Sequence, residues 1–353
     1  MDADIDEAKL EELAGKAMGD IAGAMGVLMA YLGDQAGVYR ALEEAGPITA
    51  AGLAGKLGMN EKYVHEWLSA NAALGYVTHD AATEQFSLTP EQALVMCREG
   101  HPACMQGFFM SILSQMETHD KALATFKSGE GRPWGDQSEC CFCGTDRFFR
   151  PGYEANLLAS WIPALEGVED KLMAGAKVAD IACGHGSSTV LMAKAFPNST
   201  FHGYDFHEPS IEKARARAAE HGVTNAEFHV ATAQDYPGEE YDFACIFDAL
   251  HDMGDPVGAA AHIKKTLKPD GTFMLVEPLA GDAVADNLHP LGAIYYSFST
   301  TVCTPCSLSQ EVGLGLGTQA GQKRLTEVLN EGGFGHVRRA AETAANMVLE
   351  ARA

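Results

Sequence analysis

Short apolar runs that alternate with helix-like stretches dominate the sequence from Lys177 onward. The runs lie at 178–181, 201–204, 226–230, 243–247 and 272–276. Strands separated by helical crossovers are typical of βαβ units, in which helices cover both faces of a parallel sheet. The sequence therefore predicts an α/β domain at 177–353, with a Rossmann-like, doubly wound sheet. A hairpin of strands at 337–340 and 347–350 is expected to complete it.

The first hundred residues follow a different pattern. Apolar residues recur at helical spacing over 8–31, a short helix is expected at about 50–57, and a third helix follows Asn60. Two short runs at 75–78 and 85–89 have the form of a two-stranded wing. We predict a mainly helical winged-helix domain at 1–100 and a helical connector at 101–176 that contributes to the substrate pocket. Within the connector, the Gly, Ser, Asp and Pro content of 128–147 predicts a loop.

Charge and composition restrict the partners. The formal net charge of −23 disfavours phosphate backbones and anionic membranes, and 46% hydrophobic residues suffice for two cores. The expected recognition helix carries Lys62 beside Glu61 and Glu66, so a DNA-binding regulator is only an alternative. No apolar run approaches eighteen residues, and the start of the chain is acidic. We expect a cytoplasmic protein with reduced cysteines and a small-molecule substrate, without membrane or nucleic-acid partners.

A glycine loop follows the first strand of the α/β domain. Residues 180–186 read Asp-Ile-Ala-Cys-Gly-His-Gly and precede a helix expected at 187–196. Glycines here let the backbone approach a ligand, and the lack of a third glycine at dinucleotide spacing favours a ligand without phosphates. Asp205 ends the second strand, where a carboxylate can accept hydrogen bonds from both hydroxyls of a ribose.

These motifs resemble those of class I S-adenosylmethionine-dependent methyltransferases. Asp180-x-x-x-Gly184-x-Gly186 resembles their first motif, Asp205 their ribose-binding acid, and 267–271 the turn before their fifth strand. Nearly the whole chain is similar to winged-helix methyltransferases that include mycobacterial members, through 150–153, 250–256 and 308–313. More distantly it resembles plant and antibiotic-pathway O-methyltransferases, which implies a homodimer formed through the N-terminal helices.

The resemblance also implies a cofactor and the residues that hold it. The cofactor is S-adenosylmethionine and the product S-adenosylhomocysteine. Residues 182–184 would line its methionine part, Phe206 its adenine, and Asp248 would face the methyl donor. The full set of expected cofactor-binding residues is Asp180, Ala182, Cys183, Gly184, Gly186, Asp205, Phe206, Thr232, Ala233 and Asp248. Many relatives carry an acid where Thr232 stands.

The O-methyltransferase resemblance assigns the chemistry to His251 and Asp252. His251 would be the general base, since histidine can take a hydroxyl proton near neutral pH, and Asp252 would orient it. Met253 stands where those enzymes usually have tryptophan. The alternative that His251 only caps or packs at the end of the fourth strand stays open.

Two further hypotheses concern metals and thiols. His251, Asp252 and His289 could form a metal site, as in some related winged-helix methyltransferases that bind iron. Cys303 and Cys306, or the cluster Cys140, Cys141 and Cys143, could bind zinc or serve a thiol or metalloid acceptor. An insertion at about 278–322 is expected to cover the acceptor pocket, whose predicted walls are Tyr153, Trp161, His289, Tyr296 and Gln310.

Overall fold

The computed structural model describes residues 5–352 and divides the chain into two compact units. Of the described residues, the first unit comprises 5–117 with 138–151, and the second comprises 118–137 with 152–352. The connector expected at 101–176 is therefore shared between the two units.

The first unit contains the winged helix. Helices α1 (Glu7–Gln35), α2 (Val38–Ala45), α3 (Ala50–Leu57) and α4 (Glu61–Ala73) precede the antiparallel strands β1 (Thr78–Asp80) and β2 (Gln85–Ser87). Leu42, Leu53 and Leu68 are fully buried in its core. The buried hydroxyl of Tyr39 donates a 2.6 Å hydrogen bond to Asn71 and so links α2 to α4. The predicted winged helix is confirmed.

Helix α1 is only partly covered by its own unit. Its buried residues lie between Gly26 and Gly33, whereas Leu13, Met18 and Ile21 are each at least 60% exposed. By length and composition α1 could cross a membrane, but a core helix of a soluble protein passes the same criterion. Its apolar residues are a surface that a partner helix could cover.

The loop predicted at 128–147 is corrected by the structure, in which the cysteine cluster lies on a helix. Helices α5 (Pro90–Met96) and α6 (Gln106–Glu117) continue the first unit, and α8 spans Glu139–Asn156, so the three cysteines lie on a helix. A Cβ atom at Gly144 would lie 2.6 Å from Ser111 Oγ, which shows how closely α8 and α6 approach each other. The Gly, Ser, Asp and Pro content of 128–147 indicated a loop. The segment from Glu139 is helical instead because tertiary packing of small residues overrides local propensity. The loop prediction was wrong from Glu139 onward.

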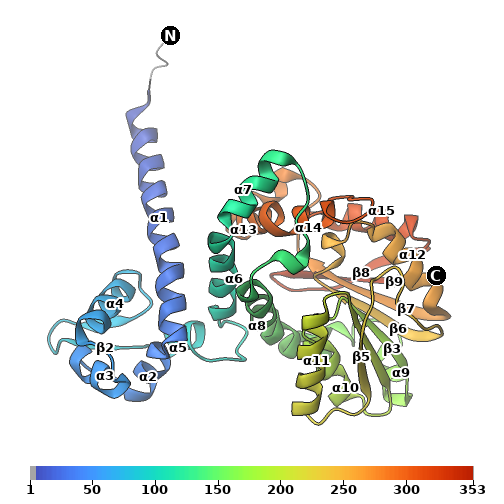
Figure 1. Ribbon diagram of the computed structural model, residues 1–353, viewed down its shortest axis with the longest axis horizontal. Helices are drawn as coiled ribbons and strands as arrows, with labels where there is room; N and C mark the ends of the chain where they lie inside the picture. Colours follow the sequence, from blue (N-terminus) through green and yellow to red (C-terminus); the bar gives the residue numbers. More distant parts are fainter. Residues whose placement is uncertain (1–4, 353) are drawn as a thin grey trace. The chain divides into compact units, whose positions relative to one another are not determined.

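The second unit holds a seven-stranded sheet in the order β5-β4-β3-β6-β7-β9-β8 (Figure 1). Five strands are parallel: β3 (Lys177–Ile181), β4 (Thr200–Asp205), β5 (Ala226–Val230), β6 (Tyr241–Phe247) and β7 (Leu267–Pro278). The antiparallel pair β8 (His336–Glu342) and β9 (Asn346–Arg352) forms the predicted hairpin. The Rossmann-like α/β prediction is confirmed.

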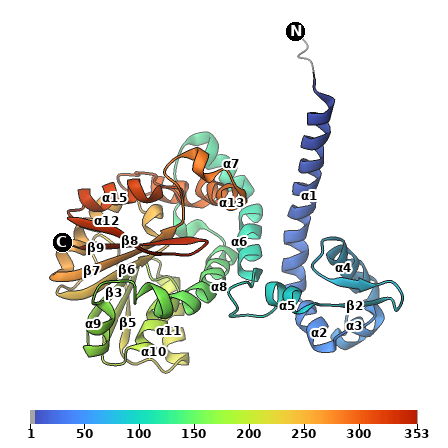
Figure 2. The same cartoon turned by 180° about the vertical axis from the view of Figure 1, so that it is seen from behind.

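Helices cover the two faces of this sheet unequally. Helices α10 (Ser187–Ala195) and α11 (Glu208–Glu220) pack against β4 and β5, where Phe228 joins their apolar core. On the other face, α12 (Pro256–Thr266) and α15 (Gly321–Glu331) lie side by side in both views (Figures 1 and 2) and pack against the strands around β6 and β7. Shorter helices complete the unit: α7 (His119–Ser128), α9 (Val168–Ala174), α13 (Pro290–Phe298) and α14 (Thr304–Leu308).

Candidate functional site

The glycines of the loop between β3 and α10 have two different structural roles. Ala182, Gly184 and Gly186 all have positive φ angles, of 57°, 53° and 73°. A Cβ atom at Gly186 would lie 2.8 Å from the ring of Phe228, so this glycine permits close packing. At Gly184, by contrast, a Cβ atom would meet no described heavy atom within 4 Å. The loop therefore leaves open space beside Gly184, where a ligand can approach the backbone.

Asp205 joins the tip of β4 to this loop. Its Oδ2 accepts a 2.9 Å hydrogen bond from the Gly184 amide, and its Oδ1 accepts one of 2.8 Å from the His207 amide. Burial raises the pKa of Asp205, although both amides favour its ionised form. Each carboxylate oxygen has a second lone pair that can accept a further donor, such as a ribose hydroxyl. The strand tips near Gly184 and Asp205 thus converge as the sequence predicts.

Asp180 lies entirely within the protein beside this loop. Its Oδ2 accepts hydrogen bonds of 2.7 Å from Ser188 Oγ and 2.6 Å from Thr189 Oγ1, and burial raises its pKa to about 6. The carboxyl group therefore ties the start of α10 to β3. Its place in the site is to position the loop.

The remaining predicted adenosine contacts lie along the ends of β4 and β5. Phe206 is 49% exposed directly after Asp205, so its ring is available for stacking. Thr232 is exposed, and its amide and hydroxyl donate to Asp235 Oδ1 at 2.9 and 2.7 Å. Asp235 thereby supplies an acidic group beside Thr232 that the sequence analysis did not include. Ala233 is half-buried, and the Cys183 side chain packs into the core of α10 and α11.

Asp248 follows β6 with a positive φ of 49°. Its Oδ2 accepts a 3.2 Å hydrogen bond from the Tyr153 hydroxyl, and its Oδ1 accepts one of 2.6 Å from the Asn346 amide. Burial, together with the charge of Glu277, raises the pKa of Asp248 to about 8. Asn346 begins β9, nearly a hundred residues further along the chain, and no local motif marks it.

His251 and Glu277 form a buried pair at the ends of neighbouring strands. His251 lies in a short 3-10 helix, Leu250–Asp252, after β6, and its Nδ1 contacts Glu277 Oε2 closely. The other oxygen of Glu277 accepts a 2.9 Å hydrogen bond from the Leu250 amide. Burial opposes the charged imidazolium, but the carboxylates of Glu277 and Asp252 outweigh it and raise the pKa of His251 well above its usual value. Glu277 is not among the site residues that the sequence predicts.

Cys303 is the third neighbour of His251. Ligand atoms of His251, Asp252 and Cys303 lie within 4.8 Å of one another, and His251 Nε2 lies 3.4 Å from Asp252 Oδ1. Burial and the charge of Asp252 raise the pKa of Cys303 to about 12, so it is a thiol at neutral pH. His289 is not in this group. It is exposed at the start of α13, where its Nδ1 accepts a 3.1 Å hydrogen bond from Gly292.

The predicted pocket walls have different surroundings. Tyr153 contacts Asp248 through its hydroxyl and packs its ring 5.2 Å from Phe247, whereas Trp161 is 1% exposed and belongs to the apolar core. Tyr296 is half-buried on α13. Gln310 donates a 2.8 Å hydrogen bond to the Asp252 carbonyl and accepts one of 3.0 Å from Gly254. Its side chain therefore holds the 250–254 loop.

Comparisons with known proteins agree with this geometry. Residues 172–333 match the family described as "Methyltransferase domain", and residues 23–98 match the "Rv2258c-like winged HTH domain". A ubiquinone biosynthesis O-methyltransferase of Acinetobacter baylyi is 26% identical over 163 residues, which cover 45% of this chain and 62% of that relative. The chain thus spans less than two thirds of this relative's length.

Solved structures match the fold over almost the entire chain. The mitomycin 7-O-methyltransferase MmcR has a TM-score of 0.69 at 18% identity, with 98% of this chain and 100% of that chain covered. Human N-acetylserotonin methyltransferase in complex with SAM has a TM-score of 0.68 at 16% identity, with 100% and 99% covered. Residues 172–333 therefore carry a methyltransferase domain, and residues 23–98 carry a winged HTH domain that precedes it.

Proposed function

We propose that this protein transfers the methyl group of S-adenosylmethionine to an oxygen atom of a small-molecule acceptor, with His251 as the general base. The contact between His251 Nδ1 and the buried Glu277 carboxylate carries the proposal. A carboxylate on one ring nitrogen fixes the tautomer and orientation of an imidazole, as in a catalytic triad. Nε2 is then the nitrogen that can take the proton of an acceptor hydroxyl.

The reaction balances with the residues present. The acceptor oxygen forms a bond to the methyl carbon as the carbon–sulfur bond breaks, and S-adenosylhomocysteine leaves with an uncharged sulfur. The acceptor's proton moves to His251 Nε2, and Asp252 Oδ1, 3.4 Å away, stabilises the imidazolium formed. Because the chemistry needs an aligned donor and acceptor, most of the rate enhancement comes from positioning.

The cofactor residues follow from the same proposal. Asp205 would hold the ribose, Phe206 would stack on adenine, and Asp248 would face the sulfonium. The open space beside Gly184 and the lone pairs left on Asp205 support this assignment. Ala182, Cys183 and Gly184 would line the methionine part, and Thr232 and Ala233 would lie beside the adenine edge.

Transfer assays test the acceptor atom directly. Purified protein with labelled S-adenosylmethionine is offered matched phenol, aniline and thiophenol acceptors, and methylated products are identified by mass spectrometry. The proposal predicts methylated phenols and a fall in kcat of about 10²–10⁴ in His251→Ala. Methylation of the amine or the thiol alone would contradict transfer to oxygen. An unchanged kcat in His251→Ala would contradict the role of His251 as the base.

A metal-assisted reaction is the second candidate, favoured by the grouping of His251, Asp252 and Cys303. Cys303 would be the third metal ligand in place of His289. The thiol of Cys303 is also the candidate group for a reaction with a thiol or metalloid acceptor. This alternative predicts that iron or zinc supports methyl transfer in the wild type and not in Cys303→Ser. Full activity of metal-free enzyme would exclude it.

We further propose a cytoplasmic homodimer formed through α1. The exposed apolar residues of α1 support this arrangement, because burying them against a second copy removes apolar surface from water. Light scattering should give twice the chain mass, and Met18→Asp with Ile21→Asp should give a monomer. The net charge of −23 argues against the DNA-binding alternative, which predicts duplex retardation at low salt.

A further inference from the structure

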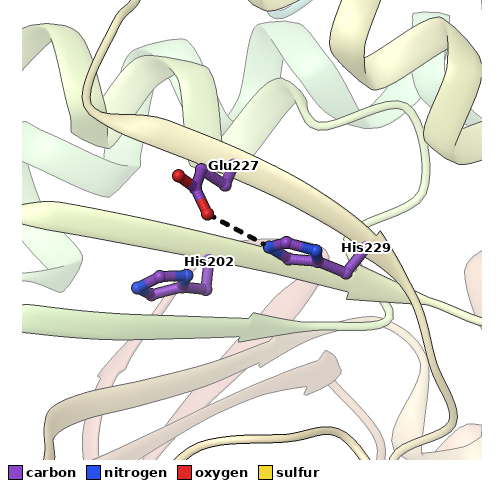
Figure 3. A group of neighbouring side chains, drawn as sticks. All are labelled: His202, Glu227 and His229. Atoms are coloured by element: carbon purple, nitrogen blue, oxygen red, sulfur yellow. Dashed lines mark ion pairs between the residues drawn. The ribbon is translucent and has the colours of Figure 1, made fainter.

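Two histidines and a glutamate lie together on strands β4 and β5 (Figure 3). His202 is paired in register with Glu227, and His229 follows two residues later on β5. Residues two apart on a strand point to the same face, so all three side chains share one face of the sheet. Phe228, between the two β5 residues, points to the opposite face and packs with α11.

On this face of the sheet Tyr204 joins the core that includes residues of α12, whereas His202, Glu227 and His229 are not part of that core. Residues 231–240, which connect β5 to β6, are all described and contain no helix, whereas α12 and α15 cover the strands around β6 and β7. His202 and His229 are consequently half-buried, and Glu227 is exposed. The three polar side chains therefore face solvent above a floor of aromatic rings, in which Tyr204 lies 5.6 Å from the His229 ring.

The spacing of the three side chains suits a metal ion. One ligand atom from each residue lies within 4.8 Å of the other two, and Glu227 Oε2 is 3.4 Å from His229 Nε2 (Figure 3). Bonds of about 2.0–2.1 Å to a tetrahedral ion place ligand atoms roughly 3.3 Å apart. The Glu227–His229 spacing already matches this value. The imidazole rings of His202 and His229 are inclined by 24° to each other, with centroids 6.2 Å apart.

Lys177 is a cationic neighbour of His202. Lys177 itself is held elsewhere: its Nζ donates a 2.8 Å hydrogen bond to the Glu239 carbonyl and lies 4.5 Å from the centre of the Tyr241 ring. An ion bound to Glu227 would therefore not displace an existing lysine–glutamate pair.

We propose that His202, Glu227 and His229 form a binding site for a divalent transition-metal ion of the zinc type. Two imidazoles and one carboxylate are ligands that zinc accepts, and three protein ligands leave a fourth position for water or an incoming group. The site lies on strands β4 and β5. It is separate from the group of His251, Asp252 and Cys303, and it does not depend on the proposed methyl transfer.

Zinc titration of the full-length, metal-free, reduced protein tests the proposal. Calorimetry should show a saturable site of one zinc ion per chain, weakened at least about tenfold in Glu227→Gln and in His229→Ala. His336→Ala removes an exposed histidine of β8 and serves as the matched control, with unchanged binding expected. Equal zinc affinity of His229→Ala and wild type would overturn the proposal, as would the lack of a saturable site. Circular dichroism establishes that each variant is folded.

Cobalt spectroscopy separates this site from the cysteines. Cobalt bound by nitrogen and oxygen ligands gives weak visible bands without the strong near-ultraviolet charge-transfer band of a thiolate ligand. The proposal predicts weak bands that persist in Cys303→Ser and disappear in His229→Ala. A thiolate band that is lost in Cys303→Ser would place the metal at the buried group instead and contradict the assignment.

Discussion

The Nδ1 atom of His251 contacts the carboxylate of Glu277 at the point where β6 and β7 end side by side. Both residues are at most 3% exposed, and the backbone amide of Leu250 fixes the second oxygen of Glu277. A charge-assisted hydrogen bond in such a place is strong and directional. The pair therefore determines both the orientation and the proton affinity of the proposed base.

Glu277→Gln should lower the pH at which the enzyme becomes active. The carboxylate of Glu277 raises the pKa of His251, so the wild-type kcat/KM should rise with pH along an acid limb above the ordinary histidine value of 6.5. Without that charge the limb should move to lower pH, while kcat falls because the tautomer is no longer fixed. Complete pH profiles of both proteins provide the test. If the acid limbs of the two pH profiles superimpose, Glu277 does not set the pKa of His251.

Binding of S-adenosylmethionine at pH 7 should release a proton from Asp248. The pKa of this carboxyl group is raised to about 8, so it is mostly protonated in the free protein at pH 7. A sulfonium nearby favours the ionised form and lowers that pKa, whereas the uncharged sulfur of S-adenosylhomocysteine does not. Calorimetry in buffers of different ionisation enthalpy measures the protons released. Equal release for both ligands, or an unchanged difference in Asp248→Asn, would contradict the position given to Asp248.

Gly186→Ala should destabilise the second unit by about 1–3 kcal/mol, the usual cost of overpacking. The added Cβ would lie 2.8 Å from Phe228, and the positive φ of 73° disfavours any side chain. Gly152→Ala is the matched control, because it lies on α8 with open space around it and should be neutral or slightly stabilising. Chemical unfolding of both variants measures their free energies of unfolding. Equal stabilities would show that Phe228 moves aside at little cost.

The sequence predicted those features that depend on local periodicity. Each parallel strand and the final hairpin lie within a few residues of the predicted ranges, and the convergence of Gly184 with Asp205 follows from the parallel sheet. The cysteine helix was missed because small residues on α8 pack closely against α6, an interaction that composition does not reveal.

The partners of the site were harder to predict. Glu277, Asn346 and Cys303 approach Asp248 or His251 from segments that are 26 to about 100 residues away in the chain. Cys303 was singled out only together with Cys306, and no local pattern links any of the three residues to Asp248 or His251. The cluster of His202, Glu227 and His229 could be predicted from the sequence only in part. Glu227 and His229 alternate along a predicted strand, but pairing them with His202 requires the register of β4 against β5.

The most direct test of the account is a calorimetric titration of the full-length protein with S-adenosylmethionine, repeated with Asp205→Ala. We predict one saturable site per chain with a dissociation constant of roughly micromolar order. Asp205→Ala should weaken it by about tenfold or more, since a hydrogen bond to a charged group contributes about 1.5–3 kcal/mol. Absence of both heat and a thermal shift with S-adenosylmethionine, in a folded wild-type protein, would contradict the account.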